Sequence, residues 1–135
     1  MPRTVDEDAI RAGVKTEIRA RRRAMRRALP PEARERRSDA IAQRVMSLDE
    51  WRDAATILAF VSKRTEVQTG SLVEHAWRTN KRVATTRITP EGDDLTLHLW
   101  ASGDELEDSG HGFRQPLRSA QRVAEASVDL VLVPA

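Results

Sequence analysis

Two basic residues near the N-terminus have the spacing needed to bind one phosphate group together. Lys15 and Arg19 are four residues apart, so in a helix their side chains lie on one face, a turn apart. Both residue types form charge-assisted hydrogen bonds with phosphate oxygens. The alternative is an ordinary solvated basic face, on which long side chains cover apolar surface and keep their charges in water. Spacing alone leaves both interpretations open.

A carboxylate, Glu66, follows the first predicted strand in the segment S-K-R-T-E-V-Q-T, residues 62–69. Open α/β sheets usually bind ligands in the crevice outside the carboxyl ends of their strands. A carboxylate there could orient a heterocycle rich in N–H groups, such as a pterin. It could equally be a loop glutamate paired with Lys63 or Arg64. Position alone leaves this choice open as well.

The arginine-rich run R-A-R-R-R-A-M-R-R, residues 19–27, could follow a nucleic-acid backbone. Lys and Arg contacts to phosphates supply most non-specific affinity for nucleic acid. No aromatic residue interleaves with these arginines for base stacking, and the apolar positions keep core spacing. We therefore favour a solvated helix face and do not expect nucleic acid as a partner.

The sequence offers little evidence for a metal site and contains no standard nucleotide-binding loop. His75, His98 and His111 fall on three different predicted elements, without a His-x-x-x-His or Asp-x-Asp pattern. The absence of cysteine removes thiolate ligands, thiol nucleophiles and disulfides together. There is also no G-x-x-x-x-G-K-[ST] loop and no G-x-S-x-G motif. We assign no metal ligand and no catalytic residue from the sequence.

The composition indicates a folded domain with an uneven charge distribution. Of the 135 residues, 39% are hydrophobic and 33% are charged, which is typical of a globular protein. The net charge is +2, but residues 11–37 contain 11 Lys and Arg against 3 Glu, and such a block attracts anions. No apolar run approaches the ~20 residues of a membrane span, and the N-terminus lacks a secretory signal. We expect a soluble, cytoplasmic, monomeric protein without a membrane partner.

Apolar residues at helical spacing predict a helical pair at the N-terminus. Thr4 with Glu7 has the pattern of a capping box. The apolar stripe of the first helix consists of Ile10, Val14, Ile18, Met25 and Leu29. Pro31 can begin a second helix. Ser71 with Glu74 predicts a further, shorter helix.

Runs of strand-forming residues predict a sheet. Residues 56–61 and 128–134 are nearly continuous apolar runs, as expected for parallel strands covered on both faces. Residues 81–88 form another strand, and the leucines of residues 95–99 alternate with polar residues, which indicates an antiparallel neighbour. Residues 101–125 are predicted as loop with at most one short helix. The expected fold class is α/β, a mostly parallel sheet layered between helices, with an N-terminal helical pair.

Five motifs follow one another along the chain. They are K-T-E-I-R at 15–19, F-V-S-K-R-T-E-V-Q-T at 60–69, N-K-R-V at 80–83, G-F-R-Q-P at 112–116 and V-D-L-V-L-V-P at 128–134. In order and spacing they resemble the 5-formyltetrahydrofolate cyclo-ligase family, also called methenyltetrahydrofolate synthetase. The family's corresponding motifs are K-x-x-[LI]-R, Y-x-S-x-x-x-E-[VIL]-D-T, G-K-R-V, F-G-I-x-E-P and I-D-L-V-L-V-P. Each motif is weak evidence, and the five in order are strong evidence.

The resemblance implies an ATP-dependent enzyme that uses Mg²⁺ and converts 5-formyltetrahydrofolate to 5,10-methenyltetrahydrofolate, ADP and phosphate. In that scheme the formyl oxygen attacks the γ-phosphoryl group, and the second folate nitrogen closes on the resulting iminium phosphate before phosphate leaves. Lys15 and Arg19 match family positions that contact ATP. Glu66 and Val61 match family positions that contact the folate.

The sequence also departs from the family pattern. Gln68, Thr86 and Gln115 stand where the family usually has Asp, Pro and Glu. Family members continue past the last strand into a Gly-rich loop that cradles phosphates, whereas this sequence ends at Ala135. We therefore expect residues 1–135 to be a single, C-terminally truncated cyclo-ligase-like domain with impaired activity. The alternatives are a catalytically silent folate- or nucleotide-binding family member and a basic nucleic-acid-binding module.

Overall fold

The computed structural model describes residues 6–135. Three helices precede the first strand, a fourth lies between the first and second strands, and four strands then follow in succession. The helices are α1 (Glu7–Ala28), α2 (Pro31–Met46), α3 (Asp49–Asp53) and α4 (Gly70–Arg78), with a 3-10 turn η1 (Glu125–Ser127). The strands are β1 (Thr56–Leu58), β2 (Arg82–Ile88), β3 (Leu95–Leu99), β4 (Leu106–Asp108), β5 (Arg114–Pro116) and β6 (Leu130–Val131). None of the described helices combines the length and the apolar character needed to cross a membrane.

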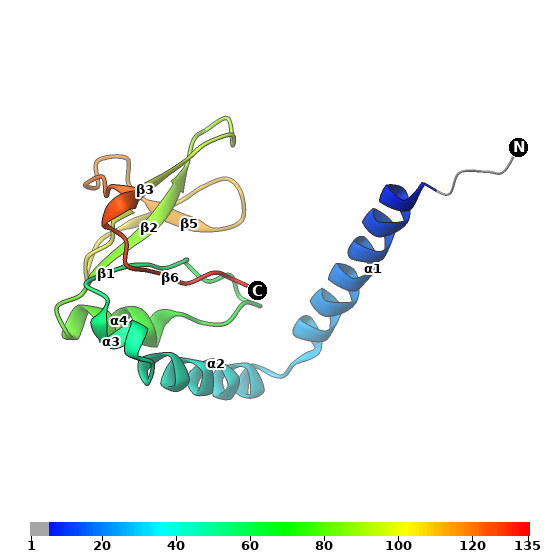
Figure 1. The fold of residues 1–135 in the computed structure, drawn as a ribbon, viewed down its shortest axis with the longest axis horizontal. Helices are drawn as coiled ribbons and strands as arrows, with labels where there is room; N and C mark the ends of the chain where they lie inside the picture. The colour runs from blue at the N-terminus through cyan, green and yellow to red at the C-terminus, as the bar shows by residue number, and fades with distance from the viewer. Residues whose placement is uncertain (1–5) are drawn as a thin grey trace, which may run out of the picture.

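The central sheet has four strands in the order β3-β2-β1-β6 (Figure 1). β1 lies parallel to both β2 and β6, whereas β2 and β3 form an antiparallel hairpin. Gly92, with φ 77°, takes the left-handed backbone conformation that the hairpin's turn requires. The predicted mostly parallel sheet with helices and the predicted hairpin are both confirmed.

The core lies between the central strands and helices α2, α3 and α4. Its buried members are Ala42, Trp51, Ala54, Ile57, Ala59, Leu72, Val73, Ala76 and Val83. Trp51 is only 2% exposed, and its Nε1 donates to His75 Nδ1 at 3.2 Å. A large aromatic side chain at this position anchors α3 against α4, because its ring is buried and its N–H is satisfied.

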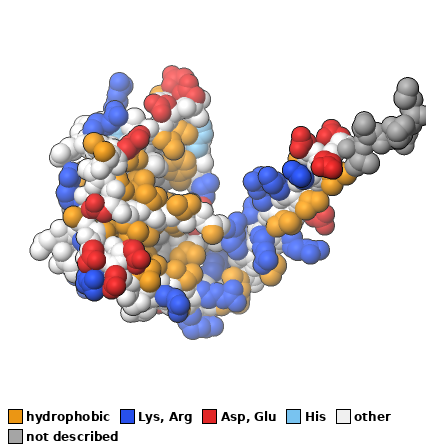
Figure 2. Space-filling view, viewed as in Figure 1, with side chains coloured by type: hydrophobic (Ala, Val, Ile, Leu, Met, Phe, Trp, Pro, Cys, Tyr) orange, Lys and Arg blue, Asp and Glu red, His pale blue; other side chains and the backbone are white. Residues whose placement is uncertain are grey.

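Helix α1 differs most from the sequence-based expectation. None of its residues is buried, and it extends away from the rest of the molecule (Figure 1). Its apolar stripe is exposed, with Ile10 at 54%, Val14 at 49%, Ile18 at 54% and Met25 at 55%. Figure 2 shows hydrophobic side chains along α1 among basic ones. Helical periodicity correctly predicted the helix, but the described chain does not bury its apolar face.

The strands are shorter than their apolar runs. β1 ends at Leu58 rather than at residue 61, and β6 contains only Leu130 and Val131 of the predicted 128–134. Among the described strands β6 pairs only with β1, over two pairs of Cα positions. Residues 101–125, predicted as loop, contain the antiparallel hairpin of β4 and β5. The sequence pattern did not predict this hairpin.

Both predicted capping boxes need correction. The N-cap of α1 is Asp6, whose side chain accepts from the Ala9 N–H at 3.1 Å, and Thr4 lies outside the described residues. α4 begins at Gly70 after an N-cap at Thr69, so Ser71 lies inside the helix. Thr69 makes no side-chain capping bond, because its hydroxyl serves the preceding loop instead.

Candidate functional site

The loop that joins β1 to α4 is closed by two hydroxyl side chains. Thr69 is 4% exposed, and its Oγ1 donates to the Phe60 carbonyl at 2.9 Å. Ser62 Oγ lies 3.0 Å from Thr69 Oγ1, accepts from the Thr69 backbone N–H at 3.0 Å and donates to the Val67 carbonyl at 2.8 Å. We call this pair the Ser62–Thr69 clasp. It joins the two ends of the loop that carries Glu66, at the carboxyl end of β1.

Gln68 supports the same loop from within. Its side-chain Nε2 donates to the Lys63 carbonyl at 2.9 Å and to the Glu66 carbonyl at 3.0 Å. Its backbone N–H donates to Ser38 Oγ on α2 at 3.0 Å. An ionised carboxylate only accepts hydrogen bonds, so an aspartate could not replace these two donated bonds. This gives a structural reason for the departure from the family's Asp at this position.

Glu66 itself is held by backbone rather than by a neighbouring cation. Its Oε2 accepts from the Lys63 backbone N–H at 3.1 Å. Within residues 6–135 it forms no ion pair with Lys63 or Arg64, the pairing considered above as the alternative. The side chain is half-buried. Glu66 therefore keeps hydrogen-bonding capacity for a ligand.

Glu66 lines an apolar pocket of about 320 Å³. The other lining side chains come from α2, the start of the loop, α4 and the end of the chain; they include Ile41, Val45, Phe60, Val67, Leu72 and Val131 to Pro134. One carboxylate in an apolar pocket is the usual arrangement for binding a flat heterocycle through a few oriented hydrogen bonds. Val61, the other residue matched to folate contact, follows Phe60 but does not line this pocket.

A second pocket, of about 640 Å³, lies between α1, α2 and the chain end, and we call it the arginine pocket. Five arginines and an apolar floor line it: Arg19, Arg22, Arg23, Arg26 and Arg37, with Ile18, Met25 and Leu29. No acidic side chain is among the lining residues. Guanidinium groups match phosphate oxygens in a bidentate geometry, and apolar side chains suit a base. The pocket therefore suits a nucleotide or another large anion.

Only one of the two predicted phosphate-binding residues lines the arginine pocket. Arg19 lines the arginine pocket, whereas Lys15, one turn earlier on α1, is exposed and does not line it. Sequence reasoning also missed Arg26, whose Nη1 donates to the Ala135 carbonyl at 2.8 Å and whose Nε is buried without a described hydrogen-bond partner. Ala135 lines both pockets. The two candidate subsites therefore adjoin at the end of the chain.

The family follows from the comparison of this sequence with known families. Residues 11–135 match the model of the 5-formyltetrahydrofolate cyclo-ligase family. The chain belongs to this family. The motif-based resemblance is thereby confirmed, and the Glu66 loop and the K-T-E-I-R motif both lie within the matched cyclo-ligase residues.

Solved structures show the same fold. The chain is similar to the NMR structure of Aquifex aeolicus 5,10-methenyltetrahydrofolate synthetase, with a TM-score of 0.77 and 23% sequence identity. The similarity covers 89% of this chain and 60% of the solved one, so the chain spans about three-fifths of that relative. No curated protein sequence matches the chain.

The described residues do not offer a ready-made metal site. Within residues 6–135 there is no group of three or more His, Cys, Asp or Glu that could hold a metal ion. His75 bonds Trp51, and His98 Nδ1 lies 2.8 Å from the Ala120 carbonyl, so both rings are occupied within the fold. We therefore assign no described residue to the Mg²⁺ that the family resemblance implies.

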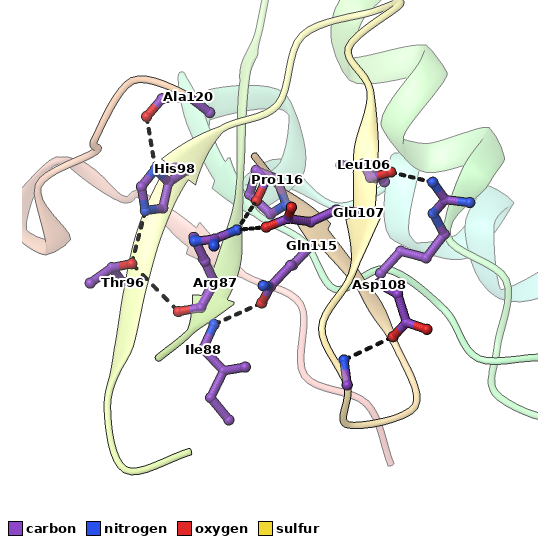
Figure 3. A network of polar contacts seen from close by, with 12 residues as sticks. Arg87, Ile88, Thr96, His98, Leu106, Glu107, Asp108, Gln115, Pro116 and Ala120 are labelled. Carbon is purple, nitrogen blue, oxygen red and sulfur yellow. Dashed lines mark hydrogen bonds and ion pairs between the residues drawn. The ribbon is translucent and has the colours of Figure 1, made fainter. Parts of the chain in front are cut away.

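A polar network attaches the β4–β5 hairpin to the end of β2 (Figure 3). Arg87 Nη1 contacts Glu107 and donates to the Pro116 carbonyl at 2.7 Å. Gln115, 4% exposed, accepts from the Ile88 N–H at 3.0 Å through Oε1. The Arg87 guanidinium lowers the pKa of the Glu107 carboxyl from its ordinary value. Gln115, where the family has Glu, thus serves as a neutral acceptor in this attachment.

The missed features have different causes. Ser62 was visible in the family motif, but its bond to Thr69 depends on a loop that returns to its starting point. Arg37 lies on α2, and it meets the arginines of α1 only because the chain turns at Pro30. The strong basic block was the one sequence signal for the arginine pocket.

Proposed function

We propose that this chain binds 5-formyltetrahydrofolate and ATP in the two adjoining pockets and that these support the cyclo-ligase reaction. The observation that carries the proposal is the meeting at Ala135 of an apolar pocket holding one carboxylate with a pocket lined by five arginines. A pterin needs an acceptor for its N–H groups, and a triphosphate needs clustered cations. Family membership supplies the reaction for which both are required.

In this proposal Glu66 accepts hydrogen bonds from the pterin, and the Ser62–Thr69 clasp keeps the carboxylate in position. Arg19 and the other arginines hold the triphosphate, and Lys15 extends the cationic face one turn along α1. Phosphoryl transfer depends on such positioned cations, because charge is spread over the phosphoryl oxygens. The chain's described residues contribute positioning and charge, and no step is assigned to a metal.

The reaction that this arrangement would serve balances as follows. The formyl oxygen bonds to the γ-phosphorus while the bond to the ADP oxygen breaks, which yields an iminium phosphate and ADP. The second folate nitrogen then attacks the activated carbon and gives up its proton, which leaves with the phosphate that carries away the former formyl oxygen. Holding that nitrogen close to the carbon converts the closure into an effectively unimolecular step, which is worth up to ~7 to 11 kcal/mol of barrier.

The test is calorimetric titration of the chain with 5-formyltetrahydrofolate and, separately, with ATP. Loss of a charge-assisted hydrogen bond costs ~1.5 to 3 kcal/mol, so Glu66→Gln should weaken folate binding by about tenfold or more and leave ATP binding unchanged. Glu74→Gln, at an exposed glutamate of α4, is the matched control. Equal folate affinity in wild type and Glu66→Gln would contradict the proposal.

The nucleotide half needs its own variants. Arg19→Ala should weaken ATP binding without affecting folate, whereas Arg44→Ala, at an exposed arginine of α2, should affect neither. Absorbance of methenyltetrahydrofolate in the presence of both substrates then reports turnover. Binding of both ligands without turnover would favour a silent family member over an enzyme. If the chain binds neither 5-formyltetrahydrofolate nor ATP, both the enzyme and the silent binding protein are excluded.

A further inference from the structure

A third pocket, of about 530 Å³, lies beside the β2–β3 hairpin and shares no lining residue with the two pockets described above. Three arginines line it, Arg87, Arg118 and Arg122, against one carboxylate, that of Glu91. We propose that this pocket is a separate oxyanion site, which binds a carboxylate or phosphate group through these guanidinium groups. We call it the β3-edge site.

Strand register places its polar side chains on one face. Arg87 pairs with Thr96 in the antiparallel β2–β3 ladder, and His98 forms an antiparallel bridge with Arg122. Paired residues of an antiparallel ladder point to the same face, and so do residues two apart on one strand. Arg87, Thr96, His98 and Arg122 therefore share one face, and all four line the pocket.

The segment that carries the other two arginines is fixed against β3 by hydrogen bonds. Leu99 N–H donates to the Gln121 carbonyl at 2.8 Å, and Val123 N–H donates to the Leu97 carbonyl at 2.9 Å. His98, 4% exposed, is bonded through Nδ1 to the Ala120 carbonyl at 2.8 Å. Since a carbonyl can only accept, Nδ1 carries the hydrogen. The backbone on both sides of Arg122 is thus held in place before any ligand binds.

Of the three arginines in the pocket, Arg118 and Arg122 have guanidinium groups that are available to bind an anion. Within residues 6–135 neither forms an ion pair, and neither side chain donates a hydrogen bond, whereas Arg87 is held by Glu107 and the Pro116 carbonyl. Both Arg118 and Arg122 are exposed. Two uncompensated cations next to a fixed third one repel each other, and a bound oxyanion relieves this repulsion with charge-assisted bonds.

The acidic residues of the neighbouring turn are mostly engaged elsewhere. The Asp93 carboxylate accepts from Thr89 Oγ1 at 2.8 Å, and the Asp94 carboxylate accepts from the Leu95 N–H at 2.9 Å. Glu91 lines the pocket without a described partner. It is therefore the residue that competes with an incoming anion, and removal of its charge should strengthen binding.

Two sources could supply the oxyanion. One is free inorganic phosphate. The other is the carboxylates of a glutamyl chain, such as a folate tail, and this source alone rests on the function proposed above. Both present oxygen pairs of the kind that arginine binds in a bidentate manner.

The test is NMR titration of the full chain with inorganic phosphate in one arm and γ-linked triglutamate in the other, at low and at physiological salt. We expect saturable shifts at the His98 ring and at the amides of Thr96 and Arg122 in at least one arm, and that arm identifies the source. Arg19→Ala, which alters the arginine pocket, should leave these shifts intact, because the two pockets share no lining residue. Failure of the ATP or folate titrations would therefore leave this result untouched.

Variants give the second readout. Arg118→Ala/Arg122→Ala should weaken binding at least tenfold, and Glu91→Gln should strengthen it several-fold. Arg36→Ala/Arg44→Ala removes the same charge from exposed positions on α2 and should leave binding within about twofold. The proposal is overturned if neither anion shifts His98, Thr96 or Arg122, or if the two double variants weaken binding equally.

Discussion

Replacement of Thr69 by valine tests whether the Ser62–Thr69 clasp stabilises the loop that carries Glu66. The substitution preserves shape and removes only the hydroxyl. The Thr69 Oγ1 donates to the Phe60 carbonyl at 2.9 Å and lies 3.0 Å from Ser62 Oγ, at a residue that is 4% exposed. Thr69→Val therefore leaves the part-buried Phe60 carbonyl without this donor and removes one contact of Ser62 Oγ.

The expected cost follows from that geometry. A buried polar group left without its partner costs ~1 to 3 kcal/mol, and no cavity term is added because valine fills the same volume. For a domain of this size, that loss lowers the melting temperature by roughly 3 to 12 °C. A loosened loop also positions Glu66 less well, so affinity for 5-formyltetrahydrofolate should fall with stability.

The assay is thermal and urea unfolding of wild type, Thr69→Val and the matched control Thr16→Val. Thr16 also donates from its Oγ1 to a backbone carbonyl, that of Ala12 at 2.9 Å, but it lies on the exposed helix α1. Its substitution should change stability by less than about 0.5 kcal/mol. If the two variants prove equally stable, the clasp contributes nothing and the reasoning fails.

Three further predictions concern the parts of the fold around the site. Trp51→Ala should lower the free energy of unfolding by ~3 to 5 kcal/mol, measured by urea denaturation, because it empties a core position and leaves His75 without its donor; a loss below ~1 kcal/mol would contradict this. Gln68→Asp removes two donated bonds within the loop and should speed limited proteolysis there, with unchanged cleavage counting against it. The backbone N–H groups of Thr56 and then Ala55 lower the pKa of Asp129 in the folded protein. The ionised Asp129 side chain therefore stabilises the fold at a pH above its pKa in the unfolded chain, and this stabilisation is lost as the pH falls through its pKa in the folded protein. The stability difference between wild type and Asp129→Ala should therefore shrink below about pH 4, and a difference independent of pH would refute the assignment.

The sequence was sufficient for features that depend on neighbouring residues. Alternation of Leu95, Leu97 and Leu99 identified β3, because a strand has a period of two whatever it pairs with. The Glu66 loop was placed at a strand's carboxyl end because one apolar run precedes it and one amphipathic helix follows. The order of the five motifs along the chain was enough to indicate the family. Each single motif or pattern is local, because a short window of the sequence contains all the residues that define it.

Only the tertiary structure decided the features that join distant segments. Arg19 and Arg37 share a pocket because of the angle between α1 and α2, which periodicity does not encode. The stripe of α1 predicted burial, but burial needs a partner surface, and the described chain supplies none. The β3-edge site combines β2, β3 and residues 118–122 through the bridge between His98 and Arg122, which the sequences of these short segments do not predict. Sequence patterns report what each segment can bury or bind, whereas the pairing of segments is determined by the free energy of the whole chain.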